Sequence, residues 1–185
     1  MALFDVSFRW AMQNEDPLMQ YKTEPDAPPG AFAISGINSA KWPEEYAFIE
    51  SLAQDQRAVA VKAFYFKNFW CTPRGTSWFD QIASDEVSKR VFDFAVNAGS
   101  VAAVRCLQEA CNSLKRTDPS GLPTEFHLHV DGELGQDTVG TANDTDSATL
   151  VAAFQQARVA YYKAIVAANP ADAVYLAAWT ARALR

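Results

Sequence analysis

Two amphipathic helical segments separated by a single glycine constrain the fold of this chain most strongly. Ser84, followed by two acidic residues, is a typical helix start, and Gly99 interrupts the helical pattern. Apolar residues recur every three or four positions on both sides of the glycine: Val87, Val91 and Phe94 before it, and Val101, Val104, Leu107, Cys111 and Leu114 after it. This spacing predicts two helices joined by a tight hairpin or a sharp kink, with Val91, Phe94 and Leu107 in the core.

Most of the remaining chain is also predicted to be helical. Helices are expected over Leu3 to Asn14, from Pro43, over Gln56 to Phe69, near Asp137 to Ala142, from Asp146 or Ser147 to the Asn169-Pro170 break, and over 171–184. The apolar face of the long helix is expected to contain Leu150, Phe154, Ala157, Tyr161 and Ile165. The proline-rich segment Tyr21 to Gly36 is predicted to be an irregular loop, and Phe126 to Val130 a short strand. The predicted fold class is therefore mainly α with a minor β element.

Composition excludes several classes of function. Of the 185 residues 49% are hydrophobic, which is enough for a real core, but no apolar run reaches the roughly 18 residues of a membrane span. The net charge of −6 and the lack of a basic stripe argue against nucleic acid as a partner. No secretory signal peptide is visible, so we expect synthesis in the cytoplasm without one. Three cysteines without a CxxC motif are expected to be buried or free thiols.

Glu15 is the first candidate for a chemical role, because it ends the first predicted helix and opens the loop Asp16 to Gly36. A general acid works from a partly apolar pocket, where desolvation raises the pKa of a carboxyl group. The apolar residues near Glu15 in the sequence could build such a pocket: Trp10, Met12, Leu18 and Met19. A single glutamate after a helix is more often a solvated surface charge, so both interpretations stay open at this point.

Several motifs resemble those of glycoside hydrolase family 108, whose members are N-acetylmuramidases, mostly phage endolysins and secretion-activator proteins. Residues 91–99, VFDFAVNAG, followed by Ala102, Ala103 and Leu107-Gln108, resemble the family signature FDxAVNxG…A…LQ. The helix end Tyr65 to Trp70 and the stretch Phe79 to Ile82 resemble motifs that precede it. Downstream, Val130 to Thr138 is similar to a motif of a predicted peptidoglycan-binding element. Motifs in the C-terminal part of that element resemble the residues Arg158, Tyr161, Tyr162, Trp179 and Arg182.

The resemblance implies a lysozyme-like helical fold, with a muramidase region over 1–114 and a peptidoglycan-binding-like region over 125–185 packed on it. It implies cleavage of the β-1,4 bond between N-acetylmuramic acid and N-acetylglucosamine, with Glu15 as general acid and no cofactor. Peptidoglycan glycan strands would be the partner, reached in the periplasm or outside the cell with the help of a phage holin or a secretion system. In this chain Asp16-Pro17-Leu18 stands where the family has Gly-Gly-Tyr. The altered loop leaves a non-catalytic peptidoglycan- or protein-binding protein as the alternative.

Further site residues are predicted around Glu15. Glycoside hydrolysis usually uses a second carboxylate, for which the candidates on the loop are Asp16, Glu24 and Asp26. We predict Asp26, Asn97 and Trp70 as substrate-binding residues, although Asn97 could instead cap its helix. Asp93, beside an apolar stripe, is predicted to be a structural hydrogen-bond acceptor. His127 and His129 lie at i and i+2 of the predicted strand without a nearby third ligand, so no metal site is predicted.

Overall fold

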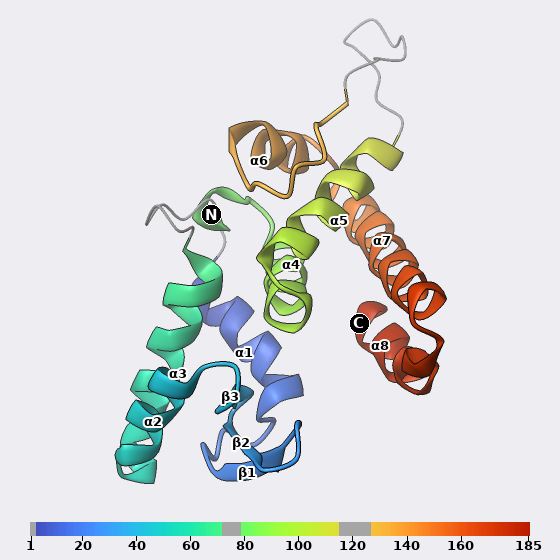
Figure 1. Cartoon of the computed structure of the whole chain (residues 1–185). Helices are drawn as coiled ribbons and strands as arrows, with labels where there is room; N and C mark the ends of the chain where they lie inside the picture. Colours follow the sequence, from blue (N-terminus) through green and yellow to red (C-terminus); the bar gives the residue numbers. More distant parts are fainter. Residues whose placement is uncertain (1–2, 72–78, 115–126) are drawn as a thin grey trace, which may run out of the picture.

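The structure is a computed structural model of the chain, described over residues 3–71, 79–114 and 127–185 (Figure 1). The described residues form eight α-helices and one three-stranded sheet, which confirms the predicted mainly α fold with a minor β element. The helices are α1 (Phe4–Glu15), α2 (Pro43–Ser51), α3 (Arg57–Tyr65), α4 (Asp85–Ala98), α5 (Ser100–Ser113), α6 (Gln136–Asn143), α7 (Ser147–Ala168) and α8 (Leu176–Ala183). Shorter 3-10 helices are Gln54–Gln56, Phe79–Gln81 and η4 (Pro170–Tyr175), and Phe66–Trp70 continues α3 as a π-helical turn.

The position of the β element was predicted wrongly. The sheet consists of β1 (Thr23–Asp26), β2 (Ala31–Ile34) and β3 (Ile37–Asn38), paired antiparallel in the order β1-β2-β3 within the segment predicted to be a loop. Its proline, Pro25, lies in the edge strand β1, where a missing backbone N–H is tolerated. Residues 127–130 form no strand, because the backbone N–H of Leu128 donates to the Asn112 side chain instead of to a neighbouring strand. Phe126 lies outside the described residues.

The predicted pair of helices around Gly99 is present. Ser84 caps α4 by accepting a hydrogen bond from the backbone N–H of Val87, and Gly99 adopts a φ of +91°, which favours glycine. Val91, Phe94 and Leu107 are fully buried, as predicted. This pair of helices lies in the middle of the fold, with α1 packed on α4 and with α7 packed on both α4 and α5 (Figure 1).

Helix α7 is rotated relative to its predicted orientation. Its N-cap is Asp146, whose carboxylate accepts from the backbone N–H of Thr149 at 2.9 Å. Leu150 and Phe154 are buried as expected, but the buried face continues through Arg158 and Tyr162. The three other residues predicted for this face are only half-buried: Ala157, Tyr161 and Ile165. The face is shifted because the Arg158 side chain points into the core, toward an acidic residue of α4.

The segment around Asp131 and Gly132 is held against α5 by the buried amide of Gln108. Its Nε2 donates to Asp131 Oδ1 at 2.8 Å and to Thr138 Oγ1 at 3.1 Å, while its Oε1 accepts from the backbone N–H of Gly132 at 2.9 Å. Both ends of the amide are therefore satisfied, as a buried polar group requires. Within the described ranges, no helix is both long and apolar enough to cross a membrane.

We predict that Phe94→Ala destabilises the protein strongly, because Phe94 contacts the rings of Phe154, Tyr161 and Tyr162 in the core. The free energy of unfolding should fall by about 3–5 kcal/mol, which for a chain of this size lowers Tm by roughly 6–20 °C. Phe48→Ala, at an exposed position of α2, is the matched control and should leave Tm nearly unchanged. Equal thermal melts for the two variants would contradict this core.

Candidate functional site

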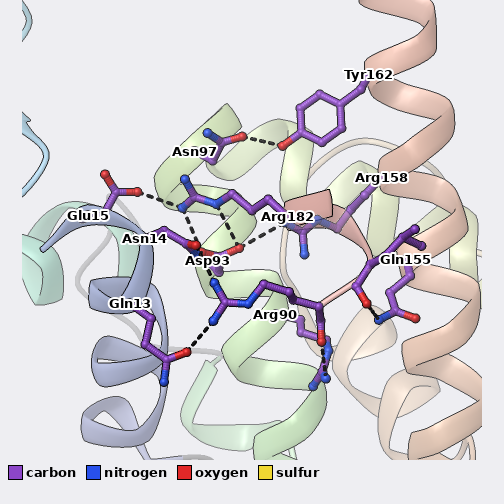
Figure 2. A network of polar contacts seen from close by, with 12 residues as sticks. Gln13, Asn14, Glu15, Arg90, Asp93, Asn97, Gln155, Arg158, Tyr162 and Arg182 are labelled. Carbon is purple, nitrogen blue, oxygen red and sulfur yellow. Dashed lines mark hydrogen bonds and ion pairs between the residues drawn. The ribbon is translucent and has the colours of Figure 1, made fainter. Parts of the chain in front are cut away.

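The helices α1, α4, α7 and α8 meet in a network of charged side chains, drawn in Figure 2. Arg182 of α8 donates through Nη2 to Glu15 Oε1 and to Asp93 Oδ1, at 2.8 Å in each case. Arg158 of α7 donates through Nη2 to Asp93 Oδ2 at 3.0 Å. Glu15, the predicted general acid, thus forms an ion pair with a residue 167 positions later in the chain.

Asp93 is the centre of this network. Its side chain and that of Arg158 are each 1% exposed, so the ion pair between them is made in the core. Asp93 also accepts from the Asn14 side chain, which confirms its predicted role as a structural hydrogen-bond acceptor. Burial lowers the pKa of Arg182, but the charges and hydrogen bonds of Asp93 and Glu15 outweigh burial and raise that pKa above its usual value. Arg182 therefore stays charged and bridges the two carboxylates.

The backbone around Glu15 explains its position. Pro17 disfavours helical backbone at the preceding residue, so α1 ends at Glu15 and the chain turns at Asp16. Gly36, in the turn between β2 and β3, lies directly against Glu15, because a Cβ added at Gly36 would stand 2.5 Å from Glu15 Oε2. The hydroxyl of buried Tyr65 donates to the Ser35 carbonyl at 2.7 Å and holds this turn in place.

The two oxygens of Glu15 have different surroundings. The Glu15 side chain is 18% exposed, and among the described residues only Oε1 accepts a hydrogen bond. Of the apolar residues expected to build a pocket, Leu18 and Met19 are exposed and Met12 is buried, while Trp10 packs against the cationic groups of Lys89, Arg90 and Arg185. Gly36 and Arg182 lie against the Glu15 carboxylate.

Asp16 stabilises the turn after Glu15. Its carboxylate accepts from the backbone N–H groups of Gln20 and Tyr21 and from the Ser35 hydroxyl, at 2.7–3.0 Å. These bonds hold a turn in which Met19 and Tyr21 have φ values of 49° and 53°, a left-handed backbone that is rare for such side chains. The Asp16 carboxylate therefore accepts its hydrogen bonds from residues of the loop, although Asp16 is adjacent to Glu15 in the sequence.

The other two loop carboxylates are exposed. Asp26 accepts from the backbone N–H of Ala27 and from the Asn38 side chain, both bonds within the hairpin. Glu24 lies in the exposed strand β1. The role of second carboxylate stays a prediction for these two residues.

The two remaining predicted substrate-binding residues lie in different environments. Asn97 is exposed, one turn beyond Asp93 on α4, and its Oδ1 accepts from the Tyr162 hydroxyl (Figure 2). Trp70 is fully buried: its ring stacks on Phe79 with centroids 4.9 Å apart, and its Nε1 donates to Asp80 at 2.9 Å. The prediction that Trp70 binds sugar does not fit this position, because its indole exposes no surface on which a sugar ring could stack.

Two shallow depressions flank the turn after Glu15, with volumes of about 580 and 250 Å³. Both are lined by Met19, Tyr21 and Ala58, and Glu15 lines neither. For metal chemistry, no group of three or more histidine, cysteine or acidic side chains suited to an ion is found within residues 3–71, 79–114 and 127–185. His127 and His129 lie at the exposed beginning of the last described segment.

The two arginines of the network lie in a segment that is similar to a known family. Residues 102–184 match a family model described as a predicted peptidoglycan domain. The match supports an interaction with peptidoglycan. We call these residues the peptidoglycan-domain segment; it begins inside α5 and includes Arg158 and Arg182, whereas Glu15 lies outside it. No curated protein matches the chain.

Arg158 and Arg182 were predicted only as motif matches, and their contacts were not predicted. A usable signal was present at Arg158, because it interrupts the otherwise apolar buried face of α7. A charged residue on a buried face needs a partner of opposite charge, so Arg158 predicts a buried carboxylate such as Asp93. Arg182 is the second arginine of the network, and its contact with Glu15 joins the peptidoglycan-domain segment to the end of α1.

We predict that Asp93→Asn is strongly destabilising, because it leaves the buried guanidinium of Arg158 without a compensating charge. Breaking a buried pair in this way costs about 3–5 kcal/mol, measured as the loss in free energy of unfolding in a urea titration. Asp55→Asn, at an exposed position, is the control with the same chemical change. Unfolding curves that coincide for the two variants would show that the network contributes little to stability.

Proposed function

We propose that the protein binds peptidoglycan and cleaves its glycan strands at the β-1,4 bond between N-acetylmuramic acid and N-acetylglucosamine, with Glu15 as general acid. The observation that carries the proposal is the 2.8 Å contact between Glu15 and Arg182. Arg182 belongs to the peptidoglycan-domain segment, and Glu15 ends the first helix of the other part of the chain. A strand bound by that segment near α8 would lie within reach of the Glu15 carboxyl group.

The proposed chemistry uses the two oxygens of Glu15 differently. Oε1 remains the acceptor of the Arg182 hydrogen bond, and Oε2, next to Gly36, carries the proton. Glu15 donates this proton to the glycosidic oxygen as the bond to the anomeric carbon breaks and positive charge develops on the sugar ring. A water molecule, or a carboxylate of the 16–36 loop, meets that charge from the opposite face of the ring.

The place of action follows from the proposed substrate. Glycan strands are outside the cytoplasm, so the protein would act in the periplasm or outside the cell. Delivery by a phage holin or by a secretion system fits this proposal, and a phage endolysin and a secreted antibacterial effector are equally compatible with it.

A second function is favoured by the ion pair itself. An ion pair uses the ionised carboxylate, whereas a general acid must carry a proton, and Asp16 is already committed to three hydrogen bonds in its loop. A protein with this arrangement could bind peptidoglycan without cleaving it. In that case Glu15 serves only as a partner for Arg182.

The two functions are separated by Glu15→Gln. Glutamine keeps the size of the side chain and can still accept from Arg182, but it has no proton to transfer. We predict that turbidity loss of a suspension of purified cell walls slows by about 100-fold to 10,000-fold, while thermal stability and wall binding are retained. Glu44→Gln, at an exposed site in the first turn of α2, should lyse walls at the native rate.

Equal lysis by the Glu15→Gln variant and the native protein would exclude Glu15 as the acid. A native protein that binds walls without any lysis would establish the second function.

A further inference from the structure

Three aromatic rings of the peptidoglycan-domain segment stack on one another from the core to the surface. Tyr162 of α7 is buried and stacks on Trp179 of α8, with ring centroids 5.2 Å apart and an interplanar angle of 22°. Trp179 stacks in turn on Tyr175, at 5.5 Å and 29°. The inner end of this aromatic stack contacts Phe94 in the core, at 5.7 Å from Tyr162.

The outer ring of the aromatic stack is exposed and held in place. Tyr175 is 54% exposed, and among the described rings it stacks only on Trp179. Trp179 is half-buried and stacks on both Tyr162 and Tyr175. Because the two inner rings fix the orientation of Tyr175, binding at its outer face loses little conformational freedom.

The aromatic stack is continuous with the site at Glu15. Tyr175, Trp179 and Arg182 are spaced i, i+4 and i+7, so they lie along one face at the end of η4 and through α8. Helix geometry places the two ends of this face about 10 Å apart. Arg182, at one end, contacts Glu15, and Tyr175 forms the other end.

One polar side chain lies at the inner end of the aromatic stack. Asn97 is exposed, and its Oδ1 accepts from the hydroxyl of Tyr162 (Figure 2). Its Nδ2 donates to no other group within the described ranges, so the Asn97 amide is available to a ligand. The aromatic stack thus has an apolar ring, Tyr175, at its outer end and an exposed amide donor, Asn97, beside its inner end. A ring and an amide donor are the two kinds of contact that a sugar with an acetamido group needs.

We propose that Tyr175 is the stacking platform of a glycan subsite that extends along α8 from Glu15, and that its ligand is a glycan strand of peptidoglycan. The C–H face of a pyranose ring packs on an aromatic face, while its hydroxyl and acetamido groups hydrogen-bond at the edges. The match of this segment to a predicted peptidoglycan domain selects the ligand class. The inference rests on the proposed binding of peptidoglycan but not on catalysis by Glu15.

The test measures binding of the full-length chain to insoluble purified peptidoglycan by depletion from solution, in the Glu15→Gln background so that the glycan stays intact. Tyr175→Ala should raise the apparent Kd by about fivefold to tenfold. Tyr175→Phe keeps the ring and should bind within about twofold of the parent. Val174→Ala, at the exposed neighbouring position, is the matched control and should bind like the parent.

Equal binding by Tyr175→Ala and the parent would overturn the inference. A Tyr175→Phe variant that binds as weakly as Tyr175→Ala would also overturn it, because the effect would then belong to the hydroxyl and not to the ring. If Tyr175→Ala melts at a lower temperature than the parent, Tyr175→Leu keeps apolar packing on Trp179 and must show the same loss of binding. Failure of every chain, including the native protein, to bind the walls would refute peptidoglycan binding and the subsite with it. Equal binding by all variants would refute the subsite alone.

Discussion

A carboxylate removed from water is stable in a protein only if nearby groups compensate its charge. Asp93 is nearly inaccessible to solvent, and the compensation comes from the guanidinium groups of Arg158 and Arg182. These three residues lie on α4, α7 and α8, so satisfying one buried charge fixes the relative positions of three helices. The apolar contacts around Phe94 supply the bulk of the packing, and the ion pairs determine which face of α7 turns inward.

The same requirement brings the candidate site together. Arg182 reaches into the fold to pair with Asp93, and this position also places its Nη2 within hydrogen-bond distance of Glu15. The end of α1 is thereby joined to the peptidoglycan-domain segment by a charged contact rather than by a flexible connection (Figure 2). In the two proposals taken together, Tyr175 at the outer end of the aromatic stack holds the glycan and the end of α1 supplies the acid. Binding by one part of the chain and catalysis by another require that the two parts be held in fixed positions, and the Glu15–Arg182 contact links them.

Local patterns in the sequence predicted the local features of this fold. The apolar spacing around Gly99, the cap at Ser84 and the buried position of Phe94 depend on residues a few positions apart, and all three are present. The sheet was missed because the prolines of residues 21–36 are typical of loops, whereas pairing at the edge of a sheet tolerates Pro25. Trp70 was assigned to sugar binding from its residue type alone, and neighbours along the chain do not reveal that it stacks on Phe79 in the core.

The site itself depends on contacts between distant positions. The pairs Asp93–Arg158 and Glu15–Arg182 span 65 and 167 positions, so no local pattern contains them. The sequence predicted that Glu15 ends a helix and that Asp93 is a structural hydrogen-bond acceptor. It did not show that one arginine connects them, because this depends on how α8 packs back onto α7.

In the proposals above, a glycan strand binds across the junction of α1 and α8. This binding can be tested by hydrogen–deuterium exchange of the Glu15→Gln chain with and without soluble peptidoglycan glycan fragments. We expect the fragments to slow amide exchange both around Glu15, over residues 15–22, and in α8. Slower exchange confined to one of these two segments, or to parts of the chain remote from both, would contradict it.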